Sequence, residues 1–263
     1  MPRKAQTESL ADSQAAAGGA AAVDRALSLL TVFKTGDSSL SLNELASRTR
    51  LYKSTALRQL ASLEHAGFVQ RLADGSYALG SELARLGSLY AASFSLDRVV
   101  LPALQALVNS TRESAAYHVL QGQPPRQSRL CLLRVDSPQS VRDNIRAGDI
   151  LPLDKGSGAR ILIAFDARRT SHSGLNDSKI ISKNLQTPQT LQDQKISALI
   201  RQQGFFAAVG DRLADVAGIS APVFRRDGSI AGALTLSMPA HRYDEKHVLP
   251  VLQAARGLAG LVG

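Results

Sequence analysis

The chain has 263 residues, of which 44% are hydrophobic and 20% charged, so we expect a globular protein long enough for two compact domains. No apolar run approaches the roughly 20 residues that span a bilayer, and the N-terminus lacks the charged, apolar and cleavage regions of a secretory signal. We therefore expect a cytoplasmic protein without membrane contact. The net charge of +9 is weak evidence for nucleic-acid binding, because most of the excess lies after residue 93.

Residues 1–22 are rich in Ala, Gly, Ser and Gln and show no sustained periodicity, which predicts a flexible tail. A first helix follows and ends at Gly36. Its predicted buried residues recur at helical spacing: Val23, Ala26, Leu27, Leu30 and Phe33. We predict a first domain over residues 23–80.

Two further helices and a tight turn follow in the order of a helix-turn-helix. Ser41 and Glu44 have the spacing of a capping box, so a helix is predicted to start there with Leu42, Leu45 and Ala46 facing inward. Residues 50–52 supply the turn. The second helix, predicted over residues 53–65, buries one side through Ala56, Leu57, Leu60 and Leu63.

The opposite side of this second helix is polar. Its side chains can hydrogen-bond base edges in a major groove, as a recognition helix does. The stretch from Arg48 to Arg58 also carries four basic residues and no acidic one. A charge cluster alone is more typical of a solvated helix face, but the helix-turn-helix order favours phosphate contacts. The candidate DNA-binding residues are Arg50, Lys53, Ser54, Thr55, Arg58, Gln59 and Ser62.

A wing and a linker helix complete this part of the chain. Gly67 ends the second helix, residues 68–71 and 76–79 read as strands, and Asp74-Gly75 closes the hairpin. Residues 81–96 are predicted as a linker helix whose apolar stripe packs on its own domain or on a second subunit. That stripe contains Leu83, Leu86, Leu89 and Tyr90.

Residues 97–263 are predicted to form a second domain of class α+β on an antiparallel sheet. Helices are expected over 101–109, 160–165 and 189–203, and a last helix is capped by Asp244. Strands are expected over 115–120, 130–135, 205–209, 219–224 and 230–238, and the final pair is joined by a turn at Asp227-Gly228. Helices interspersed with adjacent strand pairs favour this class over a regular βαβ fold.

Three segments of the chain resemble the IclR family of bacterial transcriptional regulators. KSTALRQLASLEHAGFVQR with YALG is similar to the family's recognition helix and wing, RAGDILPLDKGSGARILIA to its Leu-Pro segment and helix start, and GISAPVFRRDGSIAGALTLSMPAHR to its closing strands. The resemblance implies a winged helix-turn-helix, a helical linker, a GAF-like effector-binding domain and a homodimer or dimer of dimers. The sequence departs from the family pattern at residues 159–164 and around Asp211 and Asp215, near the implied pocket.

The resemblance places the effector-binding residues at a helix start, on one wall and on the last strand. Free amides at Ser157 and Gly158 favour a carboxylate or phosphate oxygen, although a simple N-cap explains a lone Ser-Gly pair as well. Thr235 and Ser237 present hydroxyls on one side of their strand, and Leu151 supplies an apolar wall. Such a site suits a small organic acid, and aromatic acids are among the candidates.

Other polar residues have simpler interpretations. His118 is interpreted as a satisfied structural histidine, and Cys131 as a small buried hydrophobe. Arg142 and Arg146 could neutralise an anionic effector or lie on a solvated face. One cysteine and five scattered histidines form no zinc spacing, so we expect no metal and no cofactor.

Two classes of function remain open. The first is a transcriptional regulator that binds double-stranded operator DNA, responds to a small-molecule effector and controls a catabolic operon. The alternative is a metabolite-binding protein or an enzyme whose winged helix mediates protein contacts. The sequence KGSGA around Ser157 differs from the G-x-S-x-G motif of a nucleophilic serine, and no residue can be assigned as its general base. We therefore predict no catalytic residues and no enzyme activity.

Overall fold

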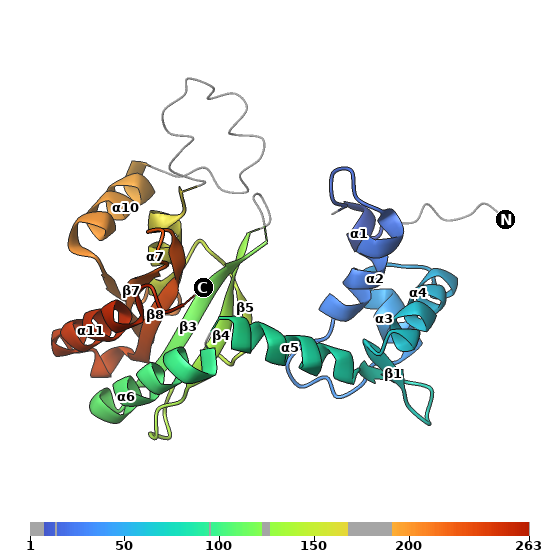
Figure 1. Ribbon diagram of the computed structural model, residues 1–263, viewed down its shortest axis with the longest axis horizontal. Coiled ribbons are helices and arrows are strands. Elements are labelled where there is room, and N and C mark those ends of the chain that lie inside the picture. The colour runs from blue at the N-terminus through green and yellow to red at the C-terminus, as the bar shows by residue number, and fades with distance from the viewer. Residues whose placement is uncertain (1–7, 14, 95, 123–126, 168–190, 263) are drawn as a thin grey trace. The chain divides into compact units, whose positions relative to one another are not determined.

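The computed structural model describes residues 8–13, 15–94, 96–122, 127–167 and 191–262 (Figure 1). The chain divides into two compact units, Met1–Tyr90 and Ala91–Gly263. Their boundary lies inside helix α5, Ser81–Ser93, so the segment predicted as a linker is shared between them. Among the described residues, no single helix is long and apolar enough to cross a bilayer.

The first unit contains the helices α1 (Leu10–Ser13), α2 (Ala21–Thr31), α3 (Leu42–Thr49) and α4 (Lys53–His65). The bounds of α4 are those predicted. Leu29, Leu45 and Leu60 are completely buried and form the centre of the core with Tyr77 from the wing. These helices therefore pack around one small apolar cluster, which holds α4 in place.

The predicted buried face of the first helix was wrong at two positions. Val23 and Leu27 are 55% and 52% exposed, whereas Leu29 is fully buried. The segment predicted as a tail also contains α1, in which Ala11 is buried and Asp12 forms an ion pair with Arg25 at 2.8 Å. The tail residues 1–7 and 14 lie outside the described residues.

The capping box at the start of α3 is confirmed. Ser41 Oγ accepts from the Glu44 amide at 3.2 Å, and Glu44 Oε2 accepts from the Ser41 amide at 2.8 Å. Helix α3 ends at Thr49, and the next residue, Arg50, adopts a left-handed conformation with φ of 57°. This conformation turns the chain sharply, so α4 begins three residues later.

The predicted wing is also confirmed. Strands β1 (Val69–Arg71) and β2 (Tyr77–Leu79) pair antiparallel, and Asp74 Oδ1 accepts from the Ser76 amide at 2.9 Å in the turn. Leu40 bridges to Tyr77 and joins the start of α3 to the wing. The wing therefore stacks on the same core that supports α4.

The second unit is built on one six-stranded antiparallel sheet in the order β5-β4-β3-β8-β7-β6. Its strands are β3 (Ser114–Gln121), β4 (Ser128–Val135), β5 (Ile150–Leu151), β6 (Phe206–Val209), β7 (Val216–Phe224) and β8 (Ile230–Pro239). A π-helical turn, Leu96–Val100, leads into α6 (Leu101–Thr111). The α+β class predicted from the strand pairs is confirmed.

Helices cover both faces of this sheet (Figure 1). Helices α6 and α11 (Val248–Leu258) bury one face in the larger core. Helices α7 (Ser157–Phe165) and α10 (Leu191–Gln203) cover part of the other. The alternation in β8 sends Leu234 and Leu236 into the first core and leaves Thr235 and Ser237 on the α7 side.

Several details of the second unit differ from the predictions. Helical spacing predicts that Leu199 and Ile200 both face inward from α10. Ile200 is buried in the core as predicted, but Leu199 is 51% exposed. The short strand β5 was not predicted. Helix α7 starts at Ser157, which agrees with the helix start predicted at Ser157 and Gly158, so the helix is longer than the segment expected over 160–165. Residues 189 and 190 of the predicted helix over 189–203 lie outside the described residues.

Candidate functional site

The polar face of α4 carries most of the predicted DNA-binding residues. Lys53, Ser54, Arg58 and Ser62 are exposed, Thr55 and Gln59 are half-buried, and Arg50 is exposed in the preceding turn. Arg48 is drawn away from this basic group, because its guanidinium binds Asp37 and donates to the Val32 carbonyl at 3.2 Å. That hydrogen-bonded ion pair lowers the pKa of the Asp37 carboxyl.

Two apolar side chains join this face, and sequence analysis did not identify either as a surface residue. Leu57 was predicted to face the core but is 45% exposed, and Tyr52, which precedes α4, is 61% exposed. An exposed aliphatic or aromatic side chain beside a basic helix face can contact a thymine methyl group or the sugar backbone. The α4 face is therefore polar with an apolar edge.

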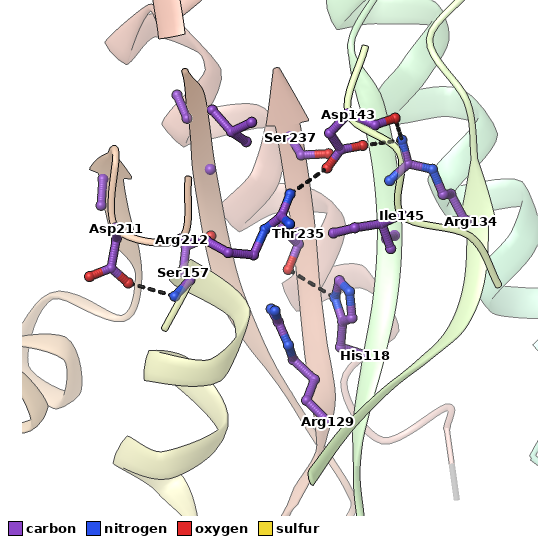
Figure 2. A pocket seen from close by; sticks show the side chains of 16 residues that line it. His118, Arg129, Arg134, Asp143, Ile145, Ser157, Asp211, Arg212, Thr235 and Ser237 are labelled. Atoms are coloured by element: carbon purple, nitrogen blue, oxygen red, sulfur yellow. Dashed lines mark hydrogen bonds and ion pairs between the residues drawn. The ribbon is translucent and has the colours of Figure 1, made fainter. Parts of the chain in front are cut away.

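A small cavity lies on the α7 side of the sheet in the second unit (Figure 2). Its free volume is about 30 Å³, which exceeds the about 10–15 Å³ that a cavity needs to hold one water molecule. The apolar part of its wall comes from Ala116, Ile145, Ala208, Val216 and Ala217. Its polar part comes from His118, Arg129, Arg134, Asp143, Ser157, Asp211, Arg212, Thr235 and Ser237.

A chain of buried hydrogen bonds crosses the floor of the cavity. Ser220 Oγ donates to Ser157 Oγ at 2.8 Å, and Ser220 Oγ and Thr235 Oγ1 are 2.8 Å apart. Thr235 Oγ1 lies 3.2 Å from His118 Nδ1. His118 is only 1% exposed, and its Nε2 has no hydrogen-bond partner among the described residues. The prediction of a satisfied structural histidine was therefore wrong for one of the two ring nitrogens.

Arg129 is the most unusual side chain of the cavity. It is 2% exposed, and neither its Nε nor its Nη2 has a hydrogen-bond partner among the described residues. Burial and the nearby Arg212 lower the pKa of the Arg129 guanidinium to about 10. Figure 2 shows Arg129, His118 and Thr235 around the same space.

The other charged groups of the cavity are partly paired with each other. Arg134 binds Asp143 and lies 2.7 Å from Asp136, and Arg212 Nη2 lies 3.5 Å from Asp143 Oδ2. Arg134 Nη1 and Arg212 Nη2 still lack hydrogen-bond partners among the described residues. The cavity thus offers several guanidinium N–H groups that are not satisfied by these residues.

The N-terminus of α7 is held in place by Asp211. Asp211 Oδ2 accepts from the Gly156 amide at 2.6 Å, and Asp211 Oδ1 pairs with Arg160 at 3.2 Å. Gly156 needs its glycine, because its φ is 91°. Gly158 also needs a small side chain, since a Cβ there would lie 2.7 Å from Arg129 Nη1 and 2.9 Å from Thr235 Oγ1.

The structure brings together most of the predicted effector-binding residues. Ser157, Thr235 and Ser237 line the cavity, and Gly158 packs against its polar side chains. Leu151 does not line the cavity but packs on Cys131 and Ile145. Ile145 instead forms the part of the apolar wall that was predicted for Leu151. Arg142 and Arg146 are exposed and do not line the cavity.

Several cavity residues were not identified from the sequence, notably Arg129, Arg134, Asp143 and Arg212. Arg129 had a usable signal, because it alternates in phase with Cys131 and so shares a strand face with a residue predicted to be buried. Cys131 is buried as predicted, and burial raises the pKa of its thiol to about 12. Within the described ranges, no three His, Cys, Asp or Glu side chains form a group that could hold a metal ion.

Comparison with known proteins agrees with both halves of this architecture. Residues 22–73 match the model of the IclR helix-turn-helix domain, and residues 88–261 match that of the bacterial transcriptional regulator IclR C-terminal domain. The glycerol operon regulatory protein of Streptomyces coelicolor is 29% identical over 236 residues, which cover 89% of this chain and 91% of that protein. The regulator KipR of Bacillus subtilis is 27% identical over 233 residues, which cover 88% of this chain and 90% of that protein.

Solved structures show the same fold. An IclR homologue from Microbacterium hydrocarbonoxydans, complexed with 4-hydroxybenzoate, superposes with a TM-score of 0.73 at 24% sequence identity. The match covers 91% of this chain and 98% of the homologue's chain. A regulator from Alicyclobacillus acidocaldarius has a TM-score of 0.75 at 19% identity, with coverage of 92% and 98%. The two family models together match nearly the whole chain. The chain therefore belongs to the IclR family of bacterial transcriptional regulators.

Proposed function

We propose that this regulator binds operator DNA through the α4 face and responds to a small organic acid that binds beside Arg129. The observation that carries the proposed effector class is the Arg129 guanidinium, which is 2% exposed and has two unsatisfied nitrogens among the described residues. A buried charge is costly unless an opposite charge and hydrogen bonds compensate it. A carboxylate supplies both, because its two oxygens match the planar N–H groups of a guanidinium.

The surroundings of Arg129 favour an anion over a cation. Arg212 and Arg134 have further unsatisfied nitrogens on the same cavity, and the N-terminus of α7 adds the positive end of its dipole. The two acidic residues of the lining already form ion pairs, Asp143 with Arg134 and Arg212, and Asp211 with Arg160, although Asp143 Oδ2 has no hydrogen bond among the described residues. The chemistry of the cavity is thus complementary to one compact anion.

Thermal-shift measurements test the effector class directly. We expect carboxylates to raise the melting temperature of the full chain, whereas their neutral amides have no effect, because only the anions compensate Arg129. The variant Gly158→Asp places its Cβ 2.7 Å from Arg129 Nη1, so its carboxylate stands beside the guanidinium. It should therefore abolish the response and leave DNA binding intact.

Gly257→Asp is the matched control, because Gly257 is an exposed helical glycine with no atom within 4 Å of an added Cβ. It should keep the carboxylate response. Stabilisation by neutral or cationic compounds alone, or an unchanged response in folded Gly158→Asp, would show that the site or its charge is misplaced.

We also propose a dimer, because one winged helix makes too few contacts for tight specific binding and paired half-sites restore them. Apolar side chains on two helices of the first unit support it: Val23 and Leu27 on α2, and Leu86, Leu89 and Tyr90 on α5, are each at least 40% exposed. Such side chains are typical of a covered surface. A dimer of dimers would bury further surface of the same chain.

Leu27→Glu and Leu86→Glu should therefore shift the protein toward monomer and weaken operator binding. Sedimentation velocity at micromolar concentration measures the shift. Leu199→Glu, at a 51% exposed leucine of α10, is the control and should leave the sedimentation coefficient unchanged. A strictly monomeric wild-type chain that still binds a palindrome tightly would contradict the dimer.

The target is proposed to be a catabolic operon. The relatives in Streptomyces are named as regulators of a glycerol operon, and one in Acinetobacter baylyi as the regulator of the pca operon. Sequencing the genes beside this one and measuring their transcripts in a deletion strain identifies the operon and distinguishes activation from repression.

A further inference from the structure

The hydrogen-bond chain on the cavity floor determines which nitrogen of His118 carries its proton. Ser220 donates its single hydroxyl proton to Ser157, so it must accept in its bond with Thr235. Thr235 then donates its own proton to Ser220 and must accept from His118 Nδ1. His118 Nδ1 therefore carries a hydrogen.

The imidazole of His118 is neutral in this setting. It is buried and surrounded by Arg129, Arg134 and Arg212, and burial followed by these positive charges holds its pKa well below the usual range. A neutral imidazole with a proton on Nδ1 has a lone pair on Nε2. That nitrogen has no hydrogen-bond partner among the described residues. It is a buried acceptor that requires a donor.

The His118 ring and the Arg129 side chain line the same small cavity. A Cβ at Gly158 would lie 2.7 Å from Arg129 Nη1 and 3.4 Å from the Nδ1 edge of the His118 ring, so the two side chains are close to each other. A ligand that satisfies both side chains must present an anionic oxygen and a hydrogen-bond donor within this cavity. The small free volume of about 30 Å³ favours a compact ligand.

We propose that the effector is a compact 2-hydroxy acid, whose carboxylate binds Arg129 and whose hydroxyl donates to His118 Nε2. This inference rests on the proposed function, since it specifies the class of acid that the cavity selects. A 2-oxo acid of the same skeleton has only acceptors, so it leaves His118 Nε2 unsatisfied. An unsubstituted acid leaves the same nitrogen bare. An aromatic acid is larger than a three-carbon acid and requires a larger rearrangement of the cavity wall.

Calorimetric titration of the full chain with four three-carbon acids tests the selection. We expect L-lactate or D-lactate to bind about tenfold more tightly than propionate and pyruvate, because a buried unsatisfied acceptor costs about that factor in affinity. Propionate or pyruvate binding as tightly as both lactates would overturn the hydroxy-acid proposal while leaving the acid site standing. Binding of benzoates but of none of these acids would overturn its compact size. Failure of every carboxylate would instead refute the proposed function.

Thr235→Val separates the role of the His118 tautomer from that of the cavity as a whole. It removes the acceptor for Nδ1–H at nearly constant volume, so the imidazole proton can move to Nε2. The preference for lactate over pyruvate should then vanish or reverse. Thr111→Val makes the same change at a buried threonine of α6 outside the cavity, whose hydroxyl bonds the Leu107 carbonyl, and should keep the preference.

The tautomer can also be observed without any ligand. Long-range ¹H–¹⁵N correlation spectra of the labelled protein distinguish protonated from bare ring nitrogens, and a His118→Gln spectrum assigns the signals among the five histidines. We expect His118 Nε2 to be unprotonated at neutral pH. A proton on Nε2 would overturn the proposal, whatever the binding results.

Discussion

Arg129→Met should abolish the stabilisation of this protein by organic acids and raise the stability of the ligand-free chain. The first effect follows because the variant removes the Arg129 guanidinium. This group is 2% exposed, and two of its nitrogens have no hydrogen-bond partner among the described residues. The second follows because methionine fills similar space without a charge to desolvate. Most substitutions of buried residues lower stability, so a gain is a distinctive outcome.

The pKa of Arg129 sets the size of the expected gain. Burial and the nearby Arg212 lower the pKa of its guanidinium to about 10, well below the ordinary value of arginine. The unfolded chain holds the proton more tightly, so charging costs the folded state on the order of 3 kcal/mol at neutral pH. The free energy of unfolding of the wild type should rise as the pH increases above about 10, because this cost is then relieved. The variant should lack that rise.

Urea denaturation at neutral pH, with and without acid, measures both effects. Arg146→Met is the control, because Arg146 is exposed and does not line the cavity, and its stability and acid response should match those of the wild type. A folded Arg129→Met protein that acids still stabilise, or one less stable than the wild type without ligand, would show that Arg129 is compensated by other groups.

Substitutions on α4 should separate base contacts from phosphate contacts. Arg58→Ala and Gln59→Ala are expected to weaken operator binding by roughly 1–3 kcal/mol each and to leave binding to random duplex less affected, if their side chains contact base edges. Lys53→Ala, at the exposed start of the helix, should weaken binding to both duplexes equally. It should also reduce the slope of log affinity against log salt concentration by about one.

Mobility-shift titrations against operator and random duplex measure these differences. Arg85→Ala is the control, since Arg85 lies on α5 and pairs with Glu82 at 2.5 Å. Equal losses on both duplexes for Arg58→Ala would remove that residue from base recognition.

The local chemistry of the chain predicted much of the first unit. The Ser41–Glu44 capping box and the Asp74-Gly75 turn depend on residues that are close in sequence, so α3 and the wing could be identified directly. Helical periodicity gives the width of an apolar face better than its centre, however. This is why Leu27 and Leu57 were assigned to the core although tertiary packing leaves them exposed.

The cavity could be predicted only in part, because its contacts join distant segments. The hydroxyls of Thr235 and Ser237 were visible from strand alternation, but the bond from Thr235 to His118 spans 117 residues. The strand pairing also has a register shift between Tyr117 and His118. The absence of hydrogen-bond partners for the Arg129 guanidinium among the described residues depends on how distant segments pack, so no local sequence pattern predicts it.

The most direct test measures the affinity of the full-length protein for the DNA upstream of its own gene, by fluorescence anisotropy, as a function of added 2-hydroxy acid. For the wild type we expect operator affinity to change at least severalfold as the acid saturates its site. For Arg129→Met we expect the same affinity without acid and no change when acid is added. An affinity that no carboxylate alters, or an equal response in the two proteins, would contradict a regulator that senses an acid at Arg129.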